Sequence, residues 1–160
     1  MGFIDVIKER ARNNKKTIVL PETEDRRTYE AAAQILKEDI ANIVLVGSEE
    51  AVKKGGEGLD LTGAIIVDPA TSDKTAAYID KLVELRSKKG MTPEQAKEIL
   101  LNQYLYYGVM MVKMGDADGM VSGACHSTAD TLRPCLQILK TKPGTKLVSA
   151  FFLMVVPDCE

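Results

Sequence analysis

The fold is indicated most clearly by the stretch Asn42-Ile43-Val44-Leu45-Val46-Gly47, in which an unbroken apolar run ends at a glycine. A strand that is apolar on both faces is typical of a parallel sheet covered by helices on each side. Short apolar runs of the same kind occur at residues 17–20, 64–67, 119–122 and 147–156. We therefore expect five strands, the last of them long and nearly unbroken.

Segments with the helical spacing of apolar residues separate these strands. The expected helices are residues 3–13, 27–38, 48–54, 72–89, 92–101, 103–114 and about 130–139. Ser48 is a good N-cap residue, and Thr92-Pro93-Glu94-Gln95 has the form of a capping box with proline at the first helical position. The alternation predicts an α/β fold: a three-layer, mostly parallel sheet with helices on both faces.

Composition excludes several classes of protein. A chain of 160 residues with 45% hydrophobic residues can bury a core without disulfides or a structural metal. Its net charge of −2 is not that of a generally basic nucleic-acid binder. The longest unbroken apolar run, residues 150–156, is far shorter than the ~20 residues that span a membrane. We therefore expect neither nucleic acid nor a membrane as a partner.

The N-terminal residues mix acids and bases with apolar residues, unlike a secretory signal. The three cysteines, Cys125, Cys135 and Cys159, are an odd number in a chain of this size. Unpaired cysteines are typical of a reducing compartment. These features predict a cytoplasmic location.

One strand end is rich in groups that bind ligands, the segment 121–134. Its candidate phosphate-binding residues are Ser122, Gly123, Ser127, Thr128, Thr131 and Arg133. Hydroxyls and exposed backbone N–H groups at a helix N-terminus suit phosphate. A cation in the first turn of a helix is opposed by the helix dipole by about 0.3–1 kcal/mol, which a bound anion at Arg133 would offset. The alternative is an ion pair with Asp130, three residues earlier.

Other patterns are weaker. The chain has no P-loop and no complete dinucleotide-binding glycine motif. Cys125 beside His126 suggests a nucleophile and a base, although adjacent loop side chains usually point apart and such a cysteine is more often a small filler. One histidine and three scattered cysteines do not form a zinc motif, so we expect no metal. The acidic cluster at residues 22–25 is either a metal site or, more simply, a solvated helix start.

The sequence resembles the N-terminal half of phosphate acetyltransferases over essentially its whole length. The matching segments are Leu20-Pro21-Glu22-Thr23-Glu24-Asp25, 43–47, 67–69, 119–124, 130–134 and 151–159. Phosphate butyryltransferases and the acyltransferase-like domain fused to some malic enzymes are similar. A non-catalytic module that senses coenzyme A or an acyl phosphate is a further alternative.

The resemblance implies reversible transfer of acetyl between acetyl phosphate and coenzyme A, with coenzyme A as a substrate and no tightly bound cofactor. It also implies an isocitrate/isopropylmalate dehydrogenase-like fold of two α/β domains in a homodimer. Family arginines that match Arg86 and Arg133 are linked to coenzyme A or phosphate recognition. Without the resemblance, Arg86 would be read as an ordinary surface cation. Residues 122–131 would lie along the cleft between the domains.

The resemblance also implies that the catalytic residues, a Ser-Arg pair and an aspartate, lie beyond Glu160. The catalytic residues within this chain are therefore unknown, and we expect little activity from the 160 residues alone. Residues 1–142 are expected to form a first α/β domain, and residues 143–160 the incomplete start of a second.

Overall fold

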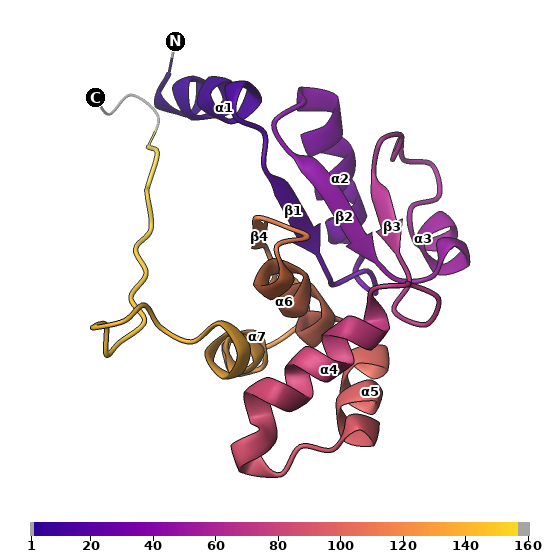
Figure 1. Cartoon of the computed structure of the whole chain (residues 1–160). Coiled ribbons are helices and arrows are strands. Elements are labelled where there is room, and N and C mark those ends of the chain that lie inside the picture. The colour runs from indigo at the N-terminus through magenta and orange to yellow at the C-terminus, as the bar shows by residue number, and fades with distance from the viewer. Residues whose placement is uncertain (1, 157–160) are drawn as a thin grey trace.

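The computed structural model describes residues 2–156, with a four-stranded sheet at its centre (Figure 1). The strands are β1 (Thr17–Leu20), β2 (Asn42–Val46), β3 (Ile65–Val67) and β4 (Gly119–Met120). Every pairing is parallel, and the order across the sheet is β3-β2-β1-β4. The α/β class expected from the sequence is confirmed.

Seven α-helices connect and flank the strands in the described part of the chain. They are α1 (Phe3–Asn13), α2 (Arg26–Glu38), α3 (Glu49–Gly55), α4 (Thr75–Arg86), α5 (Pro93–Asn102), α6 (Tyr104–Met114) and α7 (Thr128–Pro134). A 3₁₀ turn, Ser87–Lys89, extends α4, and a π-helical turn, Cys135–Leu139, extends α7. Ser48 caps α3, and Thr92 forms the predicted capping box of α5. Within residues 2–156, no helix is long and apolar enough to cross a membrane.

The core lies on both faces of the sheet because successive strand residues point to opposite sides. Val19 and Val44 face a cluster built mainly from α4, α5 and α6. Leu20 and Ile43 face the other way, toward α2 and α3. Gly108 brings α6 close to the sheet: a Cβ there would lie 2.9 Å from the Met120 sulfur, closer than atoms pack. Because all four strands are parallel, their carboxyl ends lie at one edge of the sheet.

Several expected boundaries differ. The strand expected at 119–122 is only Gly119–Met120, and the helix expected from about 130 begins at Thr128, because Ser127 rather than a later residue accepts the capping hydrogen bond. The long helix expected at 72–89 is α4 and its 3₁₀ extension.

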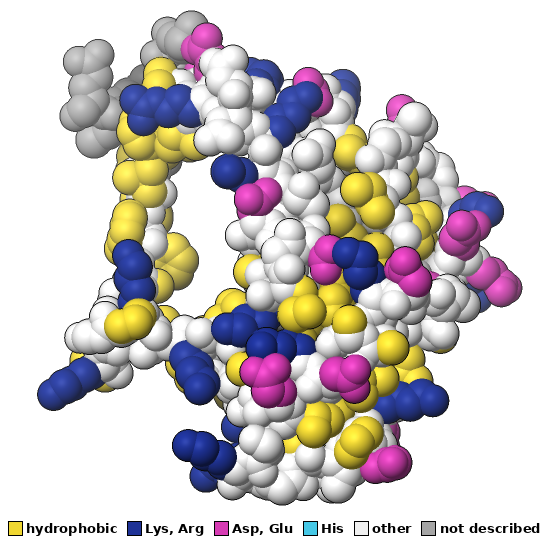
Figure 2. All heavy atoms as spheres, viewed as in Figure 1, with side chains coloured by type: hydrophobic (Ala, Val, Ile, Leu, Met, Phe, Trp, Pro, Cys, Tyr) yellow, Lys and Arg dark blue, Asp and Glu magenta, His cyan; other side chains and the backbone are white. Residues whose placement is uncertain are grey.

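The fifth strand expected at 147–156 is absent from the structure of the described residues. This segment has neither helix nor strand, and its apolar side chains are exposed, Phe152 by 94%. Figure 2 shows hydrophobic side chains along this segment, with an open gap between its middle part and the sheet. A run of apolar residues forms a strand only where a neighbouring strand pairs with it, and no described strand lies beside this one. Residues 157–160, with Cys159, lie outside the described residues.

Candidate functional site

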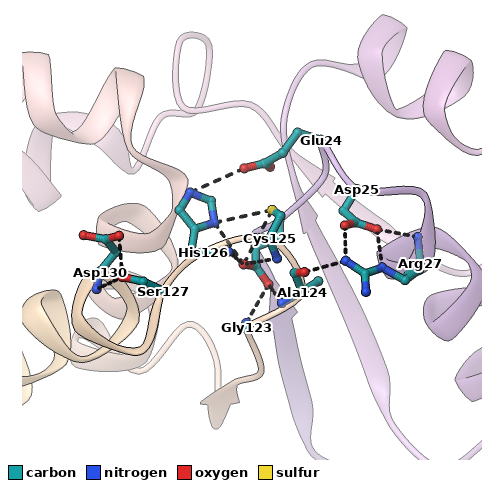
Figure 3. A network of polar contacts seen from close by, with 10 residues as sticks. Glu24, Asp25, Arg27, Gly123, Ala124, Cys125, His126, Ser127 and Asp130 are labelled. Atoms are coloured by element: carbon teal, nitrogen blue, oxygen red, sulfur yellow. Dashed lines mark hydrogen bonds and ion pairs between the residues drawn. The ribbon is translucent and has the colours of Figure 1, made fainter.

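The carboxylate of Glu22 holds the loop that leads into α7. Glu22 is only 2% exposed. Its Oε2 accepts hydrogen bonds from the backbone N–H groups of Gly123 and Ala124, both at 2.7 Å. Its Oε1 accepts from those of Cys125 at 3.1 Å and His126 at 3.0 Å. Four consecutive N–H groups therefore surround one carboxylate (Figure 3).

The sheet brings these two distant segments together. β1 and β4 are parallel neighbours, so the residues that follow them leave the same edge of the sheet. The Val121 N–H still bonds the Val19 carbonyl at 3.0 Å, and the chain then turns at Gly123. The φ angle of Gly123 is 115°, a left-handed backbone conformation that favours glycine. This turn directs the following N–H groups toward Glu22.

The environment keeps Glu22 ionised. Burial raises the pKa of a carboxyl group, but the hydrogen bonds from Ala124, His126, Cys125 and Gly123 outweigh it and lower the pKa of Glu22 to about 2. The sequence interpretation of residues 22–25 as a solvated helix start is therefore wrong for Glu22. Asp25 does start α2 as its N-cap, but its side chain is only 15% exposed and pairs with Arg27.

The same arrangement corrects the expected phosphate site. The loop N–H groups were expected to be free for phosphate, yet in this structure those of residues 123–126 are occupied by Glu22. The physical reason is that an internal carboxylate supplies the negative charge that the N–H groups attract.

Cys125 and His126 converge instead of pointing apart, because both side chains turn toward Glu22. The Cys125 Sγ lies 3.5 Å from His126 Nδ1 and 3.6 Å from Glu22 Oε1, and Nδ1 lies 2.9 Å from the same oxygen. Partial desolvation and the nearby Glu24 and Glu22 carboxylates raise the pKa of the Cys125 thiol to about 12. A thiol with this pKa is protonated at neutral pH, which argues against a free nucleophile.

A second contact holds the loop from the α2 side. Asp25 pairs with Arg27, whose Nη2 lies 2.6 Å from Asp25 Oδ2. The same guanidinium donates to the carbonyl oxygen of Ala124. Figure 3 shows this pair on the side of the loop away from His126. Both the N–H groups and one carbonyl of the loop are therefore bound to residues just after β1.

Ser127 is the N-cap of α7, Asp130 lies in the first turn, and Arg133 lies in the last turn, where the helix dipole favours a cation, rather than in the first turn as expected from the sequence. Ser127 Oγ accepts from the Asp130 N–H at 3.2 Å and donates to the Asp130 carboxylate at 2.6 Å. Arg133 Nη1 lies 3.6 Å from Asp130 Oδ1, and its side chain is 59% exposed. The ion pair weighed in the sequence interpretation is present, but its exposure and length leave most of the guanidinium free for another partner.

A cavity of about 350 Å³ opens between this turn and the start of α6. It is lined by Glu24, Asn102, Gln103, Tyr104, Leu105, Tyr106, His126, Asp130 and Arg133. Burial raises the pKa of Tyr106, and the charges of Arg133 and Arg86 oppose this rise. Of the two predicted arginines, Arg133 lines this cavity, and Arg86 is the last residue of α4 and is not among the lining residues.

Four buried polar atoms have no hydrogen-bond partner among residues 2–156. One, Glu38 Oε2, forms an ion pair with Lys8, and the other three are Arg86 Nε, Ser122 Oγ and Thr131 Oγ1. All three belong to residues predicted for the site. Such atoms normally have a partner, and a ligand or water can supply one. The remaining predicted hydroxyl, on Thr128, is at an exposed position at the start of α7.

Sequence reasoning did not select Glu22, His126, Tyr104 or Tyr106 as site residues. Both tyrosines lie in the first turn of the buried helix α6, where aromatic residues usually belong to the core. For Glu22, the signal available was a carboxylate directly after a strand and a proline. That signal identifies the sheet edge but not the distant loop that meets it.

Comparison with known proteins identifies the family. Residues 2–160 match the family described as Phosphate acetyl/butaryl transferase. The chain belongs to this family. It is 56% identical over 160 residues to the phosphate acetyltransferase of Acetivibrio thermocellus, and 52% identical over 160 residues to that of Thermoanaerobacterium thermosaccharolyticum. These alignments cover 100% of this chain and 48% of each relative.

Solved structures of the family have the same fold. A phosphotransacetylase from Staphylococcus aureus superposes with a TM-score of 0.86 at 43% identity, over 97% of this chain and 47% of that one. A phosphotransacetylase from Streptococcus pyogenes gives a TM-score of 0.84 at 38% identity, over 92% of this chain and 46% of that one. The chain thus spans about half the length of the relatives it matches.

Proposed function

We propose that the chain forms one wall of the substrate site of a phosphate acetyltransferase, which moves an acetyl group between acetyl phosphate and coenzyme A. Family membership supports the reaction class. Arg133, Ser122, Thr131, Ser127 and Thr128 would contact phosphate. Arg86 and Arg133 would contact coenzyme A.

The observation that carries the proposal is the position of Arg133 on the wall of the cavity, with its guanidinium largely exposed. Guanidinium groups suit phosphate because their fork of N–H donors bonds two oxygens at once. Both substrates carry phosphate groups. Arg86 Nε, buried and without a partner among the described residues, supports a ligand at this position.

In the proposed reaction the thiolate of coenzyme A attacks the carbonyl carbon of acetyl phosphate. A carbon–sulfur bond forms, the bond from that carbon to the phosphate oxygen breaks, and inorganic phosphate leaves. Cations and hydroxyl donors beside the departing phosphate would stabilise the negative charge that develops on it. The N–H group of Gly123 donates to Glu22 in this structure. In this proposal that N–H group fixes the loop and does not contact phosphate.

The expectations about domain division, location, oligomeric state and cofactors are part of this proposal. Residues 1–142 would form the first of two domains in an isocitrate/isopropylmalate dehydrogenase-like arrangement, with residues 143–160 opening the second. The complete protein would be a cytoplasmic homodimer. It would bind coenzyme A and acetyl phosphate as substrates, with no tightly bound cofactor.

The test is the formation of acyl-coenzyme A by the complete gene product supplied with coenzyme A and either acetyl or butyryl phosphate. We expect turnover that is faster with acetyl phosphate. Faster turnover with butyryl phosphate would make the protein a butyryltransferase. Binding of coenzyme A without turnover would indicate a sensing module, and neither binding nor turnover would overturn the proposal.

A further inference from the structure

Three different metal-binding side chains meet at the loop before α7. The carboxylate of Glu22, the thiol of Cys125 and the imidazole of His126 each offer a ligand atom, and all three atoms lie within 4.8 Å of one another. The separations are 3.5 Å for Sγ to Nδ1, 3.6 Å for Sγ to Oε1 and 2.9 Å for Nδ1 to Oε1. The atoms form a compact triangle (Figure 3).

These separations match the edges of a zinc tetrahedron. Bonds of about 2.0–2.1 Å to nitrogen and oxygen and about 2.3 Å to sulfur place neighbouring ligand atoms about 3.3–3.6 Å apart. Two of the three edges already have this length, and the third must open by only a few tenths of an ångström. An imidazole, a thiolate and a carboxylate together are a donor set that Zn²⁺ accepts.

We propose that Glu22, Cys125 and His126 bind Zn²⁺ between the end of β1 and the loop before α7. His126 also lines the cavity, so a water molecule from there can complete the coordination. The ion would join two segments that are 103 residues apart at Glu22 and Cys125. His126 and Arg133 line the same cavity, so the ion would lie beside the arginine assigned to phosphate.

The surrounding groups suit a metal ligand set. Ligating histidines usually donate their second ring N–H to a carboxylate, which fixes the tautomer. Here Nε2 of His126 lies 3.5 Å from Glu24 Oε1. The Glu22 carboxylate is itself oriented by backbone N–H groups, two of which donate to Oε2, the oxygen that does not face the proposed ion. Glu24 is therefore a positioning residue for the proposed site.

The charge balance also favours a cation. Two carboxylates lie beside the ligand atoms: Glu22 Oε1 is 3.6 Å from Cys125 Sγ, and Glu24 Oε1 is 3.5 Å from His126 Nε2. The Arg27 guanidinium is paired with Asp25, which offsets its charge. On binding, the thiol proton passes to solvent and a sulfur–zinc bond forms. Nδ1 faces the Glu22 carboxylate as a donor in this structure, so binding requires the ring proton to move to Nε2, facing Glu24, which leaves Nδ1 as the ligand atom.

The first test is calorimetric titration of Zn²⁺ into the metal-free 160-residue chain. We expect Cys125→Ser and His126→Ala each to weaken binding at least about 100-fold, more than the ~10–100-fold loss expected for the positioning variant Glu24→Gln. Cys135→Ser and Cys159→Ser are matched controls that should bind like the wild type. Equal binding by Cys125→Ser and the wild type would overturn the proposal, as would loss of binding in either control.

The second test uses the wild-type chain, so it does not depend on whether a variant folds. The chain has one histidine, so nitrogen-15 NMR of its imidazole reports on His126 alone. Zn²⁺ should move the Nδ1 resonance to that of a metal-bound nitrogen and leave Nε2 protonated. Co²⁺ should give a thiolate-to-metal charge-transfer band. An unchanged imidazole spectrum, or Co²⁺ binding without that band, would contradict the site.

Discussion

Nδ1 of His126 lies 2.9 Å from Oε1 of Glu22, although 104 residues separate the two in sequence. The contact follows from the parallel pairing of β1 with β4, which sends the segments after both strands to the same edge of the sheet. Glu22 thereby becomes the centre of the hydrogen-bond network that shapes the loop before α7. The loop in turn sets the start of the helix that carries Arg133.

Replacing Glu22 tests the importance of this network for stability. We expect Glu22→Gln to lower the free energy of unfolding by about 2–4 kcal/mol, because hydrogen bonds to a charged acceptor are lost and the amide group faces other donors. Urea unfolding measures the change, and amide exchange should speed up first at residues 123–126. Glu24→Gln, whose side chain is 53% exposed, is the matched control and should change stability by less than about 0.5 kcal/mol.

The pH dependence of stability follows from the same carboxylate. The pKa of Glu22 falls from 4.5 to about 2 on folding, so its stabilisation is complete above about pH 4.5 and is lost as the pH falls toward 2. At about 1.4 kcal/mol per pKa unit, the contribution is about 3 kcal/mol. In metal-free buffer, the stability difference between wild type and Glu22→Gln should shrink through this window. A difference that stays constant from pH 6 to pH 2 would contradict this.

Reactivity of the Cys125 thiol gives an independent check of the loop. The raised pKa of about 12, against an ordinary 9.0, leaves about 10³-fold less thiolate than in a free cysteine at neutral pH. Alkylation by iodoacetamide, followed by mass spectrometry in the presence of a chelator, should be slow although the residue is exposed. Glu24→Gln should speed it up, because one nearby negative charge is removed. Rapid alkylation of the wild type would show that the thiol lies elsewhere.

The exposed apolar segment 147–156 predicts self-association of the 160-residue chain. Phe151 is 90% and Phe152 94% exposed, and burying such side chains removes apolar area from water at about 25 cal/mol per Å². Light scattering after size exclusion should detect species larger than a monomer, and Phe151→Ser with Phe152→Ser should reduce them. A monodisperse wild-type monomer would refute this prediction.

Local sequence signals predicted much of the fold. The apolar run at residues 42–46 is a central strand, buried from Ile43 onward, and the caps at Ser48 and Thr92 are formed as expected. Propensity and capping depend on neighbouring residues, so they can be recognised in one segment. The run at 147–156 failed as a strand because strand formation also needs a paired neighbour, which sequence alone does not supply.

The site was less predictable because it depends on contacts between distant segments. The segment 121–134 was identified from its hydroxyls and Arg133, and of these Arg133 lines the cavity. The burial of Glu22 could not be seen, since an acidic residue after a strand is usually solvated. The convergence of Cys125 and His126 was not predictable either, because both side chains turn toward Glu22. The pairing of β1 with β4, which is only two residues long in β4, brings Glu22 to the loop that contains Cys125 and His126.

The most direct test of the proposed function is the affinity of coenzyme A for the complete gene product with and without Arg133. Calorimetry should show binding weakened about 10–100-fold in Arg133→Ala, because charge-assisted hydrogen bonds to phosphate are lost. Arg10→Ala, on the exposed face of α1, should bind like the wild type. Equal affinity and equal activity of Arg133→Ala and wild type would contradict the assignment of this wall of the cavity to the substrate.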